Sequence, residues 1–195
     1  MGYKKVYLVL VFLISQVSFS QEGIAVYSDY LSDNYYLLHP SMAGAANCAK
    51  LRFSGRQQWS GVDDSPSLYT MTFNGRIGEK SGAGIIAYAD RNGYSSQQGV
   101  KLSYAYHLMF SRDEVDLNQL SFGVNVNFVQ SSLDETEFLN SGDYDPGVDG
   151  TIVQQASTFN IDLGMSYNFL DYYAHFTVRN VIDSQNDIYS EFEDN

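Results

Sequence analysis

The feature that most constrains this chain is a repeated alternation of polar and apolar residues. It is clear in the stretch LRFSGRQQWSGVDDSPSLYTMTFNGR (51–76), where Leu51 and Phe53 alternate with Arg52 and Arg56. Successive side chains of a β-strand point to opposite faces, so the pattern predicts strands with one apolar and one polar face. Similar segments occur at 48–58, 67–76, 82–90, 99–110, 119–129, 158–169 and 172–179. An all-β fold is therefore expected.

The residues on the two faces indicate which face meets water. The polar faces carry Asn, Asp, Ser, Gly, Lys and His, whereas the apolar faces end in aromatic residues such as Phe110, Tyr167 and Phe169. The lengths of these segments are close to that of a tilted membrane strand, which contains about 9–11 residues. Only 17% of residues are charged, against about 25% in an average soluble domain. These properties predict a transmembrane outer-membrane β-barrel, an antiparallel meander with a polar interior. A soluble β-sandwich, whose strands also alternate, remains the alternative.

The first twenty residues have the pattern of a secretory signal peptide. Lys4 and Lys5 precede a short apolar run, and Ser18 and Ser20 provide the small residues of a cleavage site before Gln21. The expected organisation is a signal peptide at 1–20, an N-terminal periplasmic or plug-like segment at 21–47, and a partial barrel at 48–195. The protein is thus expected in the outer membrane, in contact with its lipid.

Loop lengths and strand count give expectations about orientation and completeness. The gaps 59–66, 91–98 and 130–157 alternate with the shorter gaps 77–81, 111–118 and 170–171. Short periplasmic turns and long outer loops are typical of such barrels, which places the N-terminus in the periplasm. Seven strands do not close a barrel, and 189–195 form an acidic tail. Either a partner chain completes the sheet or the chain is the N-terminal portion of a larger barrel, and we expect the second.

Charge and cysteine content exclude several classes of function. Removing the signal peptide removes two of the 11 basic residues and none of the 23 acidic ones, so the net charge falls from −12 to −14. Nucleic acid is an unsuitable partner for so acidic a chain. Cys48 is the single cysteine, so no intrachain disulfide is possible.

No residue pattern predicts catalysis, a cofactor or a metal centre. His39, His107 and His175 are far apart in the sequence and have no metal-binding spacing, although His107 and His175 could meet inside the barrel. The acidic stretch 143–150 lacks the spacing of a calcium loop. The glycine-rich run at 82–84 opens a strand and not a helix, which excludes dinucleotide binding of the usual kind. We expect neither an enzyme, a cofactor nor a metal.

Several short motifs resemble those of the PorP/SprF family of Bacteroidetes outer-membrane proteins. They are YYLLHPSMAG (35–44), RQQWSG (56–61) with a proline seven residues after the tryptophan, GAGI (82–85), DRNG (90–93) and YAYH (104–107). The resemblance covers about 35–180. The family usually has Asn-Pro-Ala where this chain has His39, Pro40 and Ser41, and its members are longer than this chain.

The resemblance implies a non-enzymatic barrel that serves type IX protein secretion and gliding motility. Its implied partners are the machinery proteins or a large secreted cell-surface adhesin. It also implies that Leu51 and Phe53 face lipid and that Arg56 and Trp59 anchor the outer rim, with Arg56 paired to a carboxylate. The family-motif residues are Pro40, Gly44, Arg56, Gln57, Trp59, Pro66, Asp90 and Gly93. An outer-membrane solute channel and a secreted β-sandwich that binds glycan or calcium remain alternatives.

Overall fold

The protein folds as one antiparallel sheet, which the computed structural model describes for residues 34–46, 48–62, 64–112, 117–134 and 153–182. Each strand pairs with its neighbours in the chain, in the order β1-β2-β3-β4-β5-β6-β7. The strands are β1 (Lys50–Gln57), β2 (Ser67–Arg76), β3 (Ser81–Asn92), β4 (Ser95–Arg112), β5 (Leu117–Asp134), β6 (Val153–Phe169) and β7 (Tyr172–Val178). The predicted all-β meander is confirmed, and no second sheet packs on it within the described ranges, as a sandwich would require.

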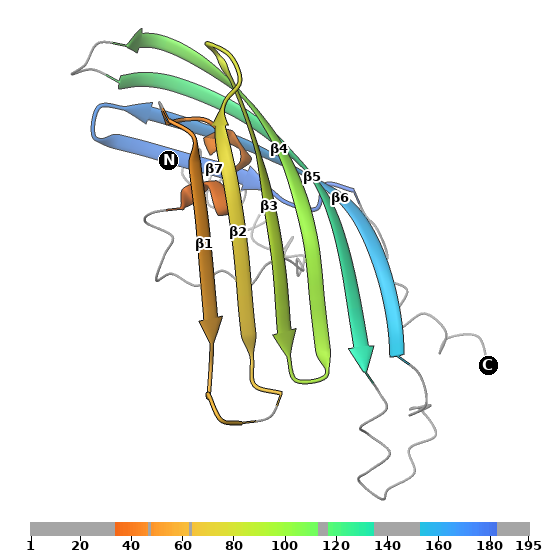
Figure 1. Ribbon diagram of the computed structural model, residues 1–195. Helices are drawn as coiled ribbons and strands as arrows, with labels where there is room; N and C mark the ends of the chain where they lie inside the picture. The colour runs from red at the N-terminus through yellow and green to blue at the C-terminus, as the bar shows by residue number, and fades with distance from the viewer. Residues whose placement is uncertain (1–33, 47, 63, 113–116, 135–152, 183–195) are drawn as a thin grey trace, which may run out of the picture.

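The sheet curls into part of a barrel wall, and a short segment lies inside the curve (Figure 1). This N-terminal segment, residues 34–46, contains the 3-10 turns η2 (Tyr35–Leu37) and η3 (Pro40–Met42). Its contacts reach from β2 to β7, so it spans the concave face. None of the helical turns described is long and apolar enough to cross a membrane.

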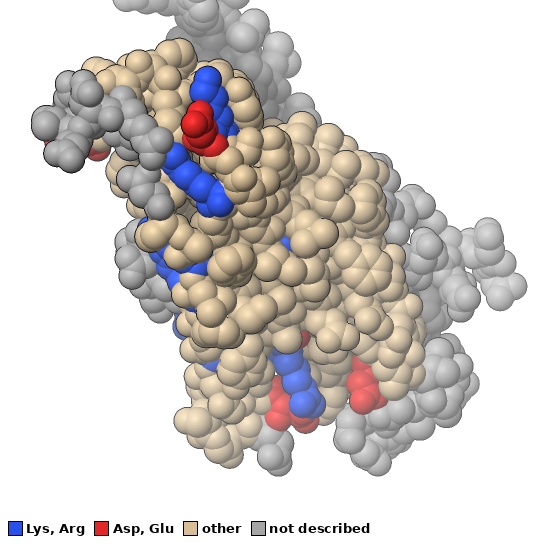
Figure 2. All heavy atoms as spheres, turned by 45° about the horizontal axis from the view of Figure 1, so that its top comes forward, with Lys and Arg blue, Asp and Glu red and all other residues tan. Residues whose placement is uncertain are grey.

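The convex face is the apolar one, as the alternation predicted. Leu51 and Phe53 point outward, and Phe53 is 71% exposed, whereas Arg52 and Arg56 are half-buried on the concave side. Figure 2 shows that Lys, Arg, Asp and Glu gather near the strand ends and along one border of this face, leaving its middle almost uncharged. A face this apolar and this exposed is suited to lipid and not to water.

The apolar band has the height of a membrane. On β4 it runs from Val100 to Phe110, and it ends on β5 and β6 at Phe128 and Phe159, which lie level with Val100. A rise of about 3.4 Å per residue and a strand tilt of about 40° give a height of about 25 Å, which is the apolar band of an outer-membrane barrel.

Three strands are longer than predicted, because polar residues that look like loop continue the ladder. β4, β5 and β6 contain 18, 18 and 17 residues. The expected gap 91–98 contracts to a turn at Gly93, whose φ is +62°, and Tyr94. Beyond the band, Gln98, Gln130 and Gln155 bond in series through their side-chain amides at 3.3 Å. Serine and glutamine continue the strands beyond the apolar band, where alternation in hydrophobicity ends.

The first strand also begins later than predicted. β1 starts at Lys50, and Cys48 is exposed just before it. The other predicted segments coincide with strands to within a few residues at one end or both, and the gap expected at 130–157 is mostly outside the described residues.

Replacing a lipid-facing side chain by a cation tests the position of the band. Leu163 lies midway along the outward face of β6, so Leu163→Arg should destabilise the protein in lipid vesicles by about 2–4 kcal/mol, as at a bilayer midplane. Ser157→Arg, two residues beyond Phe159 on the same face, should cost about 0–1 kcal/mol. Urea unfolding followed by heat-modifiable gel mobility measures both. Equal costs for the two variants would contradict the assigned band.

Candidate functional site

The concave face is a polar surface with a peptide segment packed on it. Its buried residues include Thr70, Thr72, Asn74, Ser103, His107, Gln119, Ser121, Asn125, Asn127, Asp162 and Ser166. Buried polar groups need hydrogen-bond partners, since each unpaired one costs free energy. The N-terminal segment supplies several of these partners, and the site is built where the two meet.

A row of very small residues receives the segment. Gly82, Ala105, Gly123 and Gly164 are direct cross-strand partners on β3, β4, β5 and β6, so they form one line across the sheet. A Cβ added at Gly123 would overlap the amide nitrogen of Ser41 and the carbonyl carbon of Pro40, and one at Gly164 would lie 2.8 Å from Pro40 Cγ. We call these four residues the glycine row. Because its members have no side chain or only a methyl group, the two backbones can approach each other closely.

Two further glycines fit the ends of the segment to the sheet. Gly44 has a φ of +66°, and a Cβ there would be 2.7 Å from the carbonyl oxygen of Gly75. Gly84 leaves room for the hydroxyl of Tyr36, which would lie 2.5 Å from a Cβ at that position. Side chains at either position would force the segment away from β2 and β3.

Directed hydrogen bonds fix the segment along the row. His107 Nε2 donates to the carbonyl oxygen of Ala43 at 3.0 Å, while its Nδ1 lies 2.9 Å from Ser121 Oγ. Ser41 hydrogen-bonds Ser166, and Tyr36 hydrogen-bonds Ser103 at 2.7 Å. At the β2 side, Asn34 Nδ2 donates to Thr72, the Gly44 amide donates to Asn74, and Arg76 Nε donates to Gly44 O. Four strands, β2, β4, β6 and β7, thus hold the segment by side-chain bonds, and β3 and β5 receive it by close packing.

Stacked rings join the segment to the last strand, β7. His39 lies on His175 with ring centroids 5.0 Å apart, and its Nδ1 is 2.9 Å from Thr177 Oγ1. Tyr35 contacts Tyr173 and His175 with centroids 5.8 and 5.4 Å apart. Contacts of this kind contribute roughly 0.5–1.5 kcal/mol each. The start of the described chain therefore helps to hold its last strand in place.

Burial sets the charge state of the segment's titratable groups. Burial, together with smaller effects of the nearby His175 and Arg179, lowers the pKa of His39 to about 4. Burial raises the pKa of Tyr36 to about 12, despite its hydrogen bond to Ser103. Both side chains are consequently neutral at pH 7, which suits a contact made of hydrogen bonds and stacking.

A buried ion pair lies next to the segment's site. Lys101 Nζ is 3.4 Å from Asp162 Oδ2, and both side chains are almost fully buried. Asn125 donates to the same carboxylate at 3.3 Å, and the backbone amide of Asn180 donates to its other oxygen at 3.1 Å. Removing one member would leave the other charge buried and unpaired, which is strongly destabilising. Asp162 therefore ties β4, β5 and the chain that follows β7 together.

Comparison with known proteins gives the family. Residues 19–195 match the family model described as type IX secretion system membrane protein PorP/SprF. The chain belongs to the PorP/SprF family. No curated protein and no solved structure matches it significantly. The resemblance inferred from the short motifs is confirmed, and with it membership of a family of type IX secretion membrane proteins.

Two of the predicted PorP/SprF motif residues lie in the N-terminal segment. Pro40 opens η3 and is buried over Gly123 and Gly164, and Gly44 makes the positive-φ turn against β2 and β3. The family's usual Asn-Pro-Ala corresponds here to His39, Pro40 and Ser41, and all three touch the sheet. The motif therefore marks the part of the segment that is most closely packed.

The other six predicted motif residues gather at the long-loop end of β1, β2 and β3. Arg56 on β1 and Asp90 on β3 both face inward, and each is the cross-strand partner of Leu68 on β2. Gln57 is the last residue of β1. In the loop between β1 and β2, Trp59 is 70% exposed with a φ of +50°, and Pro66 O accepts from the amide of Gln58 at 2.9 Å. The amide of Gly93 donates to Asp64 O at 3.2 Å. The role of Arg56 and Trp59 in anchoring the rim remains a prediction.

Sequence reasoning missed the residues that form the site. Gly123 and Gly164 fell on the polar faces of their strands and were given no role, and the run at 82–84 was considered only as a phosphate-binding loop and rejected. These glycines could have been recognised from the pairing register of the strands, because they fall on one row once adjacent strands are aligned. The histidine prediction was also wrong in its pairing, because two strands separate His107 from His175, and His39 stacks on His175 instead.

Nothing in the described part of the chain groups three or more His, Cys, Asp or Glu side chains as a metal site would. The acidic stretch 143–150 lies outside the described residues.

Adding one methyl group to the glycine row should loosen the segment. Gly123→Ala places a Cβ against Ser41 and Pro40, and overpacking of this kind costs about 1–3 kcal/mol, so amide exchange at 36–43 should accelerate by about 5- to 100-fold. Gly78→Ala is the matched control, since a Cβ there would meet only Ser81 Cβ at 3.8 Å. Hydrogen exchange with mass spectrometry measures both. Unchanged protection in Gly123→Ala would mean that the segment does not lie in the row.

Acidification should also weaken the segment's docking. The pKa of His39 is about 4 in the docked state, against 6.5 for a free side chain, so the undocked form takes up a proton first as the pH falls. Protection factors at 36–43 should therefore fall between pH 6.5 and pH 4 and be constant above pH 7. His39→Gln should reduce this dependence. An equal decline in native protein and variant would assign it to other groups.

Proposed function

We propose that this PorP/SprF protein is a non-enzymatic outer-membrane β-barrel component of type IX secretion and gliding motility. It would anchor a secreted surface adhesin or support the trans-envelope machinery. The observation that carries the proposal is the occupied interior, because the N-terminal segment packs across the concave face from β2 to β7. A wall with its interior filled is suited to holding partners and less suited to passing solutes.

The domain organisation follows the same proposal. Residues 1–20 would be removed on export, 21–47 would remain as the interior plug, and 48–195 would contribute the barrel wall. The apolar band supports contact with outer-membrane lipid along β1–β7. The first twenty residues and the acidic tail lie outside the described residues.

The long-loop end offers a shaped surface to a partner. Asp64 pairs with Arg91, and Asp64 O accepts the Gly93 amide, so the loop between β1 and β2 is fixed to the turn between β3 and β4. Trp59, Val62 and Tyr94 are exposed on these connections. Exposed aromatic side chains on an ordered loop are common at protein interfaces.

Affinity purification from native membranes tests the proposal. The tagged native protein, extracted from solubilised outer membranes, should copurify machinery proteins or one large surface adhesin. The intact mass of the purified protein should be that of a chain that starts at Gln21. Trp59→Ala, which removes the largest exposed apolar side chain of the loop, should retain less of the partner, whereas Leu170→Ala at the short-turn end should retain all of it.

Two other outcomes would reject the secretion role. Protein that stays soluble would favour a secreted domain. Protein that is purified alone and conducts ions in a planar bilayer would favour a solute channel, since a filled interior should give no conductance.

A further inference from the structure

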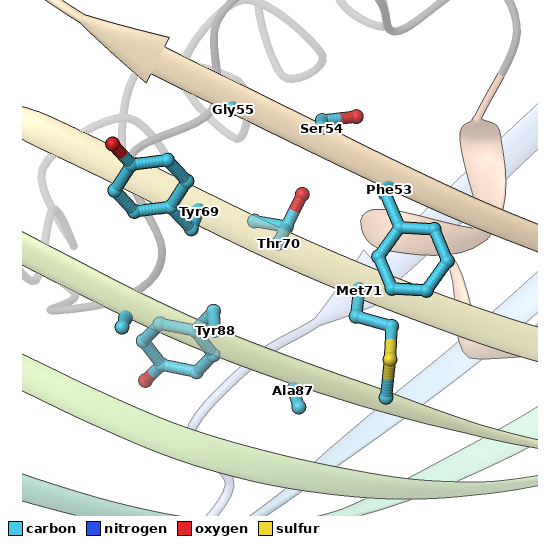
Figure 3. A pocket seen from close by; sticks show the side chains of 9 residues that line it. Phe53, Ser54, Gly55, Tyr69, Thr70, Met71, Ala87 and Tyr88 are labelled. Carbon is cyan, nitrogen blue, oxygen red and sulfur yellow. The ribbon is translucent and has the colours of Figure 1, made fainter.

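An apolar groove crosses the convex face near the first strands (Figure 3). Its floor is formed by Gly55, Ala87 and Ala89, whose small side chains leave the backbone of β1, β2 and β3 accessible, and its walls by Phe53, Tyr69 and Met71. The groove encloses about 480 Å³. Most other outward positions in the band carry large side chains, with Ala83 and Ala174 as exceptions, and small residues on neighbouring strands come together at this hollow.

The groove lies where the apolar band ends. Phe53, Met71 and Ala87 are on the row that contains Val100 and Phe128, the last apolar row of β4 and β5. The next row outward contains Gly55, Tyr69 and Ala89 and continues to Gln98 and Gln130, which are polar. A molecule in the groove would thus have its apolar part at the depth of hydrocarbon and its polar part at the interface.

A cationic side chain lies beyond the polar end of the groove. Arg91 follows Ala89 by two residues on β3, so it faces the same side, and its side chain is 60% exposed. It pairs with Asp64, which is 40% exposed. Exposed ion pairs contribute about 0–1 kcal/mol, so the guanidinium can exchange this partner for another anion at little cost. The planar guanidinium matches the geometry of phosphate as well as that of carboxylate, so Arg91 is able to bind a phosphate group in place of Asp64.

We propose that this groove and Arg91 form a binding site for an anionic phospholipid, one with a net negative headgroup, of the leaflet on the long-loop side. An acyl chain would lie over Gly55, Ala87 and Ala89, between Phe53 and Tyr69, and the phosphate would accept from Arg91. The site rests on the assignment of the convex face to lipid. Charge complementarity and continuity with the apolar band favour a lipid over a protein, because only an amphiphile places a chain below this boundary and an anion above it.

Native mass spectrometry of the full chain in detergent, titrated with phosphatidylglycerol or phosphatidylcholine of the same acyl chains, tests the site. Phosphatidylglycerol should bind about five- to tenfold more tightly, as one charge-assisted hydrogen bond allows. Arg91→Gln should remove this preference, and Ala87→Phe, which fills the groove, should lower the binding of both lipids. Asp64→Asn should strengthen the binding of phosphatidylglycerol, because Arg91 loses its competing partner.

Two controls separate the site from general lipid contact. Val126→Phe places the same aromatic ring on the outward face of β5, and Lys80→Gln removes a cation at the opposite strand end; neither should change lipid binding. Heat-modifiable mobility confirms that each variant is folded.

Equal binding by Arg91→Gln and native protein, or equal effects of Ala87→Phe and Val126→Phe, would overturn the proposal while leaving the secretion role untouched. A copurified protein lost only in Ala87→Phe, with lipid binding unchanged, would assign the groove to a protein partner and overturn the lipid site. A chain that remains soluble would remove the membrane assignment itself.

Discussion

The backbone ladder is the constraint on which the rest of the structure depends. In hydrocarbon an unpaired amide or carbonyl group costs several kcal/mol, so each spanning strand must be bonded on both sides along its length. Antiparallel neighbours pair both sides of the described strands β2 to β5 over most of their length and of β6 from Leu163 to Phe169, and the strand order β1 to β7 follows the chain without a crossover. Once the pairing of the strands is fixed, the alternation of side chains places each one on the outer or the inner face. The two faces therefore form separate surfaces.

The interior face combines two properties that are rarely needed together. It must be polar enough to pair with peptide groups, and it must be flat enough along one line for a peptide to reach its backbone. Ser103, His107 and Ser166 provide the first, and the glycine row provides the second. Glycine in the interior of a strand destabilises it, because the backbone is more flexible there and no side chain packs. Here the packed segment restores rigidity at the positions where the sheet would otherwise be most pliable.

Much of the fold could be predicted from the sequence, because a strand in lipid has only one pattern that satisfies both faces. The order of the strands, the outward placement of Leu51 and Phe53 and the family were all predicted correctly. The ends of β4 and β5 were not, since Gln98 and Gln130 lie beyond the apolar band, where the alternation stops. The site was predicted least well. Pro40 and Gly44 were identified as motif residues, but their partners Gly123 and Gly164 become recognisable only when register aligns strands that are distant in sequence.

The contacts of the N-terminal segment have a consequence for the order of folding. Tyr35 and His39 bond to Tyr173 and Thr177, each across 138 positions of sequence. The segment precedes all seven strands in the chain, yet these contacts exist only after β7 has joined the sheet. Contacts this distant form late, because the intervening chain must be ordered first. Docking of the segment is therefore complete only when the last described strand is in place, and it requires β2, β4, β6 and β7 to be aligned in the register seen here.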